Sequence, residues 1–172
     1  MKKNLLLMTL LCLTIPFVSC SSSSDDEDEY EGSGRSSKTE RLLYGRWIPY
    51  TLDDGNFSFL DEVGWIVFNK NHTFEFRAYD KSLALKGKWN LTETTDMYDR
   101  KTIEFIVDGW GEIWQTYRNM SKKEIDNILI GSRWYFVVDD IHSNYMRIVR
   151  IMLIYPTGET ENASVKMEWR RE

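Results

Sequence analysis

Apolar and polar residues alternate along most of the chain after its first quarter, and this period of two restricts the chain to a β fold. The clearest case is residues 65–79, where the polar stretch 69–72 separates two alternating segments. In the second segment Phe74, Phe76 and Ala78 fall on one face. Two such segments joined by a short polar loop predict a β-hairpin with its aromatic residues in the core.

The same pattern predicts further strands along the chain. They are expected at residues 45–52, 83–91, 101–107, 112–117, 133–138, 145–155 and 163–169. Gly87 interrupts the second of these, which predicts a bend or bulge because a glycine has no side chain to pack. The stretch Pro156-Thr-Gly158 is typical of a turn between the last two strands.

One helix is expected among the strands, over residues 122–130. Ser121 and Glu124 have the spacing of a capping box, and Gly131 stands where a helix usually ends. Ile125 and its apolar neighbours fall on one face, so a helix this short must be stabilised by packing against the sheet. We expect it to act as a lid or plug at one end of a barrel.

The two cysteines limit how the domain is stabilised. Cys12 and Cys20 both lie in the N-terminal segment, so a mature chain that begins at Cys20 has no pair for an internal disulfide. About eight antiparallel strands without a disulfide fit either a closed barrel or a two-sheet sandwich. Closure removes exposed strand edges, which favours an all-β, antiparallel up-and-down barrel.

Short motifs resemble those of the lipocalin-like domain lipoproteins of Bacteroidetes. The stretch Leu42-Leu-Tyr-Gly45-Arg-Trp47 is similar to their Gly-x-Trp opening, Phe68-Asn-Lys-Asn-His-Thr-Phe74 to the hairpin that follows, and Gly87-Lys-Trp89 to a third-strand motif. The resemblance covers residues 41–92 and implies a lipocalin-like barrel. The second and third motifs of classical lipocalins are absent.

The N-terminus has the form of a bacterial lipoprotein signal. Lys2 and Lys3 precede an apolar run over residues 5–18 that is too short and too interrupted to span a membrane. The run ends at residues 17–20, Phe-Val-Ser-Cys, which resembles a lipobox and implies lipid attachment at Cys20. The alternative is an ordinary secretory signal with an incidental cysteine.

Residues 20–40 are expected to form a disordered linker. They contain seven acidic and two basic side chains, with Ser and Gly between them. The predicted organisation is therefore a signal peptide at 1–19, an acidic Ser-rich linker at 20–40 and a barrel domain at 41–172. An acidic, Ser-rich segment after the cysteine resembles a surface-export signal, so we expect a lipid-anchored protein of the outer membrane. The cell surface is favoured over the periplasmic face.

Charge and motif content exclude several classes of function. Residues 41–172 carry 18 basic and 20 acidic side chains, so no strongly basic domain is present for binding nucleic acid. The two histidines, His72 and His142, lack metal-ligand spacing. His142 and Ser143 lie next to Asp139 and Asp140, but residues of one turn cannot converge as a hydrolytic triad does. We expect no cofactor, no metal and no enzymatic activity.

Aromatic residues supply the candidate binding site. Trp47, Trp65 and Trp89 are expected to close the barrel and fill its core. Trp110 and Trp114 lie in a glycine-flanked turn, where exposed indoles are candidates for binding a ligand.

An arginine is also expected near the closed end of the barrel. Either Arg170 or Arg150 is a candidate to cover an indole face there, as an arginine does in lipocalins. The alternative is an arginine that faces solvent on a strand, and the sequence does not decide between the two.

Two functions remain open from the sequence, and the first is favoured over the second. The first is non-catalytic binding of a small apolar or glycan ligand at the barrel mouth. The second is an accessory or inhibitory role, in which a filled barrel is a scaffold that contacts a protein partner of an outer-membrane complex. The volume of the barrel interior distinguishes them, because a ligand site needs a cavity of several hundred cubic ångströms.

Overall fold

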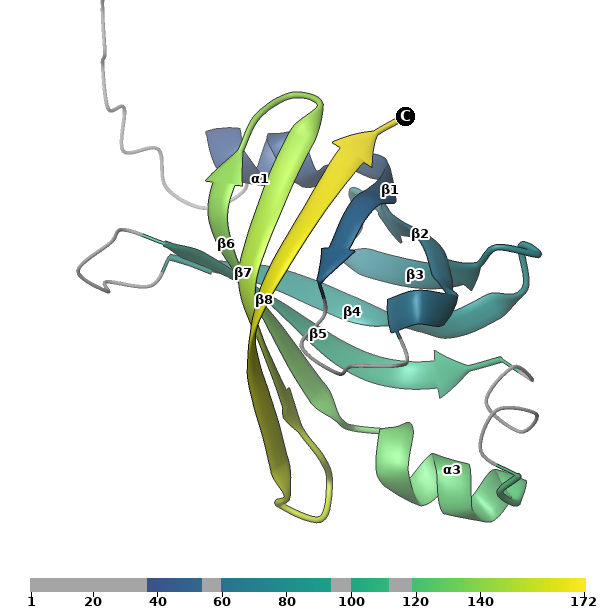
Figure 1. The fold of residues 1–172 in the computed structure, drawn as a ribbon. Coiled ribbons are helices and arrows are strands. Elements are labelled where there is room, and N and C mark those ends of the chain that lie inside the picture. The colour runs from purple at the N-terminus through teal and green to yellow at the C-terminus, as the bar shows by residue number, and fades with distance from the viewer. Residues whose placement is uncertain (1–36, 54–59, 94–99, 112–118) are drawn as a thin grey trace, which may run out of the picture. The chain divides into compact units, whose positions relative to one another are not determined.

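Eight antiparallel strands form a closed barrel in the computed structural model, which describes residues 37–53, 60–93, 100–111 and 119–172 (Figure 1). The strands are β1 (Gly45–Asp53), β2 (Val63–Phe68), β3 (Thr73–Ala78), β4 (Leu83–Glu93), β5 (Lys101–Trp110), β6 (Arg133–Ile141), β7 (Tyr145–Ile154) and β8 (Thr160–Arg171). Two short α-helices, α1 (Lys38–Leu43) and α3 (Lys122–Leu129), and a 3-10 turn, η1 (Leu60–Glu62), complete the described elements.

Each strand pairs with the next along the chain, and β1 pairs with β8 to close the barrel. The up-and-down barrel expected from the alternation is therefore confirmed, and the sandwich is excluded. The predicted strand at residues 112–117 lies outside the described residues. None of the helices in the described part of the chain has the length and apolar character needed to cross a bilayer.

The alternation places large apolar side chains inside the barrel. Phe74, Phe76 and Ala78 are all buried, as predicted for the hairpin of β2 and β3. The predicted irregularity at Gly87 is also confirmed, because the β4–β5 register shifts between Lys86 and Gly87. A Cβ atom at Gly87 would overlap the carbonyl oxygen of Ile106, so the close approach of these two strands requires a glycine.

Helix α1 lies at one end of the barrel, at the top of Figure 1. Its capping box, formed by Ser37 and Glu40, was missed in the sequence analysis, which assigned residues 38–40 to the linker. Leu43 is fully buried, and its carbonyl oxygen accepts a hydrogen bond of 2.7 Å from the Trp47 indole. We call this end, where β1 begins, the closed end.

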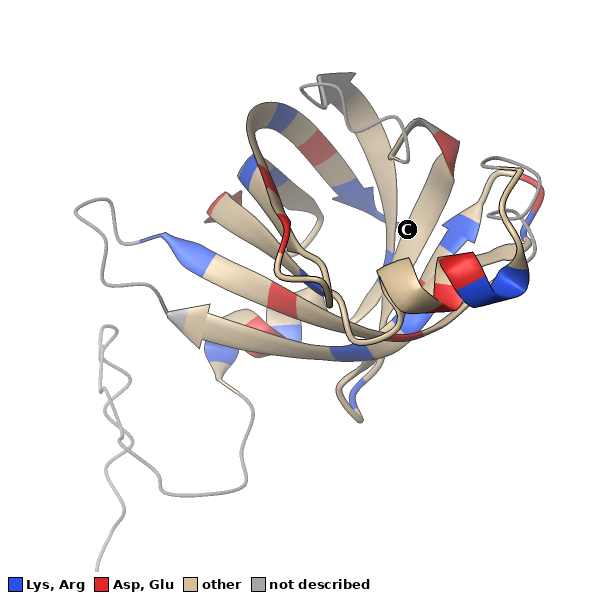
Figure 2. Cartoon of the chain, turned by 90° about the horizontal axis from the view of Figure 1, so that it is seen from below, with Lys and Arg blue, Asp and Glu red and all other residues tan. Residues whose placement is uncertain are grey.

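Helix α3 lies at the opposite end, between β5 and β6, with the capping box predicted at Ser121 and Glu124 (Figures 1 and 2). Ile125 and Leu129 are buried and belong to the same core as the strands. The chain leaves the helix through Gly131, whose φ of 85° explains the preference for glycine. The predicted helix is confirmed, and its two buried residues pack against the barrel core.

Candidate functional site

Aromatic rings pack together in the part of the barrel interior that surrounds Phe105. Phe105 lies at the centre, with its ring centroid 4.9 Å from Phe74, 5.4 Å from Phe76 and 5.0 Å from Phe136. Three of these residues, Phe74, Phe76 and Phe105, have no solvent-exposed surface, and neither does Trp89. A void large enough to admit water would expose the side chains that line it, so no such void adjoins these rings.

Trp47 and Trp89 fill the core as predicted, and the prediction for Trp65 is wrong. Trp47 and Trp89 are fully buried, whereas Trp65 is half-buried and lies among the outward positions of β2. The guanidinium carbon of Arg46 lies 4.1 Å from the centroid of the Trp65 ring. The period-two pattern explains this difference, because Ile66 and Phe68 take the inward positions of β2.

Trp110, one of the two candidate ligand-binding residues, ends β5 and joins it to α3. Its indole N–H donates a hydrogen bond of 2.7 Å to Oδ1 of Asp126, and its ring packs against the core in a half-buried position. This geometry gives Trp110 a structural role, because one ring holds both a strand and the helix. Trp114 and Cys20 lie outside the described residues.

Arg171 is the arginine that lies opposite Trp47 at the closed end, and within the described residues neither Arg170 nor Arg150 covers an indole. Arg171 pairs in register with Trp47 and donates hydrogen bonds to the carbonyl oxygens of Tyr44 and Ser143. Arg170, one residue earlier, points outward, and its guanidinium lies 3.6 Å from the centroid of Tyr50. Arg150 is exposed on β7. The one-residue error follows from the period of two, which sends adjacent residues to opposite faces.

Helix α1 is held to the barrel by a polar cluster. The Glu40 carboxylate lies 3.0 Å from Nε2 of His72 and accepts a hydrogen bond of 3.1 Å from the Tyr44 hydroxyl. The His72 ring stacks on Trp89, with centroids 5.0 Å apart. These contacts join the β2–β3 turn to the helix at the point where the described chain begins.

A small pocket of about 270 Å³ lies between α1 and the adjoining ends of two strands. It is lined by Lys38, Thr39, Leu42, Lys101, Val138, Asp139, Asp140 and Ile141. Its two carboxylates have partners within the protein: Asp139 is bound by Arg147 at 2.6 Å, and Asp140 lies 3.1 Å from His142. The pocket is smaller than the roughly 300–1,000 Å³ typical of small-molecule sites.

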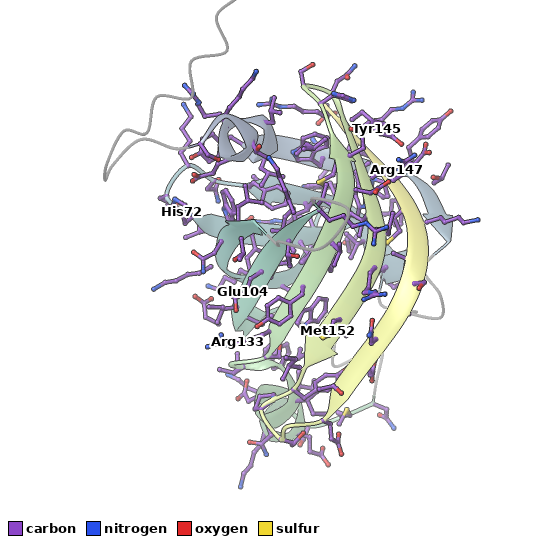
Figure 3. All side chains as sticks on the ribbon, turned by 90° about the vertical axis from the view of Figure 1, so that its left-hand side faces the viewer. His72, Glu104, Arg133, Tyr145, Arg147 and Met152 are labelled. Atoms are coloured by element: carbon purple, nitrogen blue, oxygen red, sulfur yellow. The ribbon has the colours of Figure 1, made fainter. Side chains whose placement is uncertain are left out.

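The outward residues of β7 and β8 form a surface with an excess of positive charge. We call it the β7–β8 basic face, and it consists of Tyr145, Arg147, Arg150, Lys166, Glu168 and Arg170. Figure 3 shows Tyr145 and Arg147 near the upper end of β7. Burial and then the nearby Glu168 charge raise the pKa of the Tyr145 hydroxyl above its usual value, because both disfavour the phenolate.

No protein-family model, curated protein or solved structure matches this chain. The candidate sites therefore rest on the geometry of the described residues. Within those residues there is also no group of three or more His, Cys, Asp or Glu side chains arranged to hold a metal ion.

Proposed function

We propose that this protein is a lipid-anchored accessory protein of the bacterial outer membrane, in which a filled barrel serves as a scaffold for contact with a protein partner. The observation that carries the proposal is the packed interior. Phe74, Phe76, Trp89 and Phe105 have no exposed surface, and their rings contact one another or neighbouring aromatic residues. A barrel that has no room for a ligand beside these rings acts through its outer surface.

Ligand binding at the barrel mouth is the less favoured hypothesis. Trp110, which was expected to be free for a ligand, has its indole N–H bound by Asp126 and its ring packed against the core. A ligand that uses the indole N–H would have to compete with Asp126 for it. The contact of the ring with the core also reduces the area that is open to an apolar or a glycan ligand.

We propose a non-catalytic role because the polar groups near the His142 turn contact neighbouring side chains at the surface. Asp139 binds Arg147, and Asp140 lies beside His142. A general base needs a substrate position within hydrogen-bond reach, together with a third group that orients it. The side chains of this exposed turn offer no such arrangement among the described residues.

The lipid anchor is proposed at Cys20, with residues 20–36 as the tether and the cell surface as the location. Metabolic labelling with an alkyne analogue of palmitate tests the attachment. Cys20→Ala should abolish the label, whereas Cys12→Ala should retain it, because Cys12 lies within the signal that is removed. Label on the Cys20→Ala variant would refute the anchor. Proteolysis of intact cells separates surface exposure from periplasmic exposure.

Native mass spectrometry of the lipidated protein tests the scaffold role. The expected result is the mass of the acylated chain alone. A lipid or glycan that co-purifies at one molecule per chain, and is lost when Trp110 is replaced by Ala, would overturn the scaffold role in favour of ligand binding.

A further inference from the structure

We infer that the contact between Glu40 and His72 is a pH-sensitive latch, which fastens α1 to the barrel more firmly when the His72 ring is protonated. The latch is a property of the folded chain and goes beyond the proposed scaffold role. Three features of the molecule support it. The contact joins two elements far apart in the chain, the barrel holds the histidine in place, and the second histidine makes no equivalent contact.

The Glu40 carboxylate is the part of the latch that belongs to α1. Its side chain is only 14% exposed, and Oε1 lies 3.0 Å from Nε2 of His72. The same oxygen accepts a hydrogen bond of 3.1 Å from the Tyr44 hydroxyl, and Oε2 accepts one of 3.2 Å from the Ser37 backbone. A mostly buried charge needs such donors, because it has little contact with water. Ser37 and Tyr44 are the two caps of α1, so His72 is the donor that comes from the barrel.

His72 is held in place by the sheet. Its N–H donates to the carbonyl oxygen of Asn69 at 3.1 Å, and its own carbonyl oxygen accepts from the Trp89 N–H at 2.8 Å. Its φ of 60° places it in the left-handed region of the β2–β3 turn. The ring stacks on the fully buried Trp89 with centroids 5.0 Å apart, and Figure 3 shows it at the end of the barrel where α1 lies. These contacts fix the ring relative to the strands, so it does not follow α1 if the helix moves.

Protonation of the ring strengthens both of its contacts. The distance of 3.0 Å requires a proton on Nε2, because two lone pairs this close would repel each other. A neutral imidazole can carry that proton, and the imidazolium adds a full positive charge. The hydrogen bond to Glu40 then becomes charge-assisted, and the ring on Trp89 becomes a cation over an indole face. Helix α1 is therefore held more tightly by the protonated ring.

The second histidine of the chain provides the comparison. Histidine is the side chain that ordinarily changes charge between pH 5 and 8, and the chain has two. His142 lies 3.1 Å from Asp140 within a single turn, where the two side chains are 67% and 37% exposed. Its ring centroid is 6.5 Å from that of Tyr145, farther than the 5.0 Å between His72 and Trp89. Protonation of His142 thus strengthens a local, solvent-screened contact, whereas protonation of His72 acts between a helix and the sheet.

The other charged groups on the elements next to His72 keep their charge over this range of pH. They are the exposed cations Lys38, Arg41, Lys70 and Lys88, and the ion pair of Glu75 with Arg77 on β3. Water and salt screen the repulsion between the exposed cations and a protonated ring. Glutamate side chains ordinarily become protonated near about pH 4.3, below this range. Between pH 5 and 8 the change of charge at the latch therefore comes from His72.

The latch affects how the domain is attached, because α1 follows directly after the segment proposed as the tether. If α1 leaves the barrel, residues 37–44 join that tether and lengthen it by roughly 25 Å when extended. This consequence rests on the proposed lipid anchor. The latch itself does not, so the two can fail separately.

Hydrogen exchange tests the latch. Exchange of the α1 amides is measured by NMR on the processed protein in neutral detergent at pH 5 and pH 8, where histidine is mostly charged and mostly neutral. Each rate is corrected for the intrinsic effect of pH on exchange, which gives the opening constant of the helix. This constant should be about three to five times larger at pH 8, because the neutral ring binds Glu40 less tightly.

Two variants remove the pH response in different ways. Glu40→Gln keeps an oxygen that can accept the same hydrogen bonds but removes the negative charge. His72→Asn removes the ring, and asparagine tolerates the left-handed backbone at this position. Each variant should make the opening constants at the two pH values nearly equal. His142→Asn is the matched control and should keep the wild-type ratio.

Equal opening constants at the two pH values in the wild type would overturn the latch, and so would an unchanged pH response in Glu40→Gln. A response lost in His142→Asn and kept in His72→Asn would overturn it in favour of the other histidine. Circular dichroism shows whether His72→Asn folds, and if it does not, Glu40→Gln decides the question. The labelling of Cys20 and the native mass spectrum are unaffected by these outcomes, so the anchor and the scaffold role are tested independently.

Discussion

Trp89 and Trp65 lie on opposite sides of the same barrel wall, and they differ in what surrounds them. Trp89 is fully buried, donates its N–H to the carbonyl oxygen of Asn69 and contacts Phe68 edge-on. Trp65 lies outside, under the guanidinium of Arg46. On the inner surface the rings around Trp89 and Phe105 contact several neighbours each. On the outer surface Trp65 contacts a single guanidinium, so we expect changes there to affect the fold less.

The largest expected effect comes from the centre of the inner surface. Phe105→Ala should lower the free energy of unfolding by about 3–5 kcal/mol, because it removes ring contacts to several neighbours and leaves a cavity. Tyr79→Ala, at an exposed position, is the control and should cost less than about 0.5 kcal/mol. Urea denaturation followed by circular dichroism measures both. A similar loss of unfolding free energy in the two variants would contradict the proposed difference between the inner and outer surfaces.

A smaller effect is expected at Gly87, where the backbone of β5 occupies the space that a side chain would need. Gly87→Ala should destabilise the protein by about 1–3 kcal/mol, because the new methyl group overlaps the carbonyl of Ile106 and forces β4 and β5 apart. Lys88→Ala, exposed on the same strand, is the matched control. If Gly87→Ala unfolds at the same urea concentration as the wild type, the strand pair is more adaptable than its close approach indicates.

On the outer surface, Arg46 and Trp65 should be coupled by only about 0.5–1 kcal/mol. A double-mutant cycle with Arg46→Ala and Trp65→Ala isolates this term from the separate ion pair of Arg46 with Glu172 at 2.7 Å. A coupling well above this range would show that the outer ring contributes to the fold as the inner rings do.

The smallest effect concerns the cap of α3 and its dependence on pH. Hydrogen bonds from the Ser121 side chain and backbone lower the pKa of Glu124. The cap therefore stabilises the helix at pH values above the ordinary glutamate pKa. This stabilisation is lost as the pH falls through the lowered pKa of Glu124. Ser121→Ala should raise the Glu124 pKa, as measured by NMR titration. Ser82→Ala should raise the pKa of Asp80 instead, because Ser82 lowers it in the same way. A Glu124 pKa unaffected by Ser121→Ala would show that the cap is not formed.

Local pattern was enough to predict most of the strands, the second helix and the irregularity at Gly87. Alternation assigns residues to faces without knowledge of their partners, and the Ser121 capping box is a signal within four residues. Helix α1 has an equivalent signal at Ser37 and Glu40, but it lies at the end of an acidic, polar stretch. A helix as short as α1 is stable only when it packs against other parts of the protein. The contacts of Leu43, Tyr44 and His72 provide this packing, and they form only in the folded barrel.

The candidate site needed the tertiary structure. Composition identifies the aromatic residues and arginines, but only the closed barrel determines which tryptophan lies inside, that Asp126 engages Trp110, and that Arg171 rather than Arg170 lies opposite Trp47. The sequence by itself determined a β protein with alternating faces, because periodicity is a local property. The packing of rings around Phe105 was decided by strand register, which brings together residues far apart in the chain.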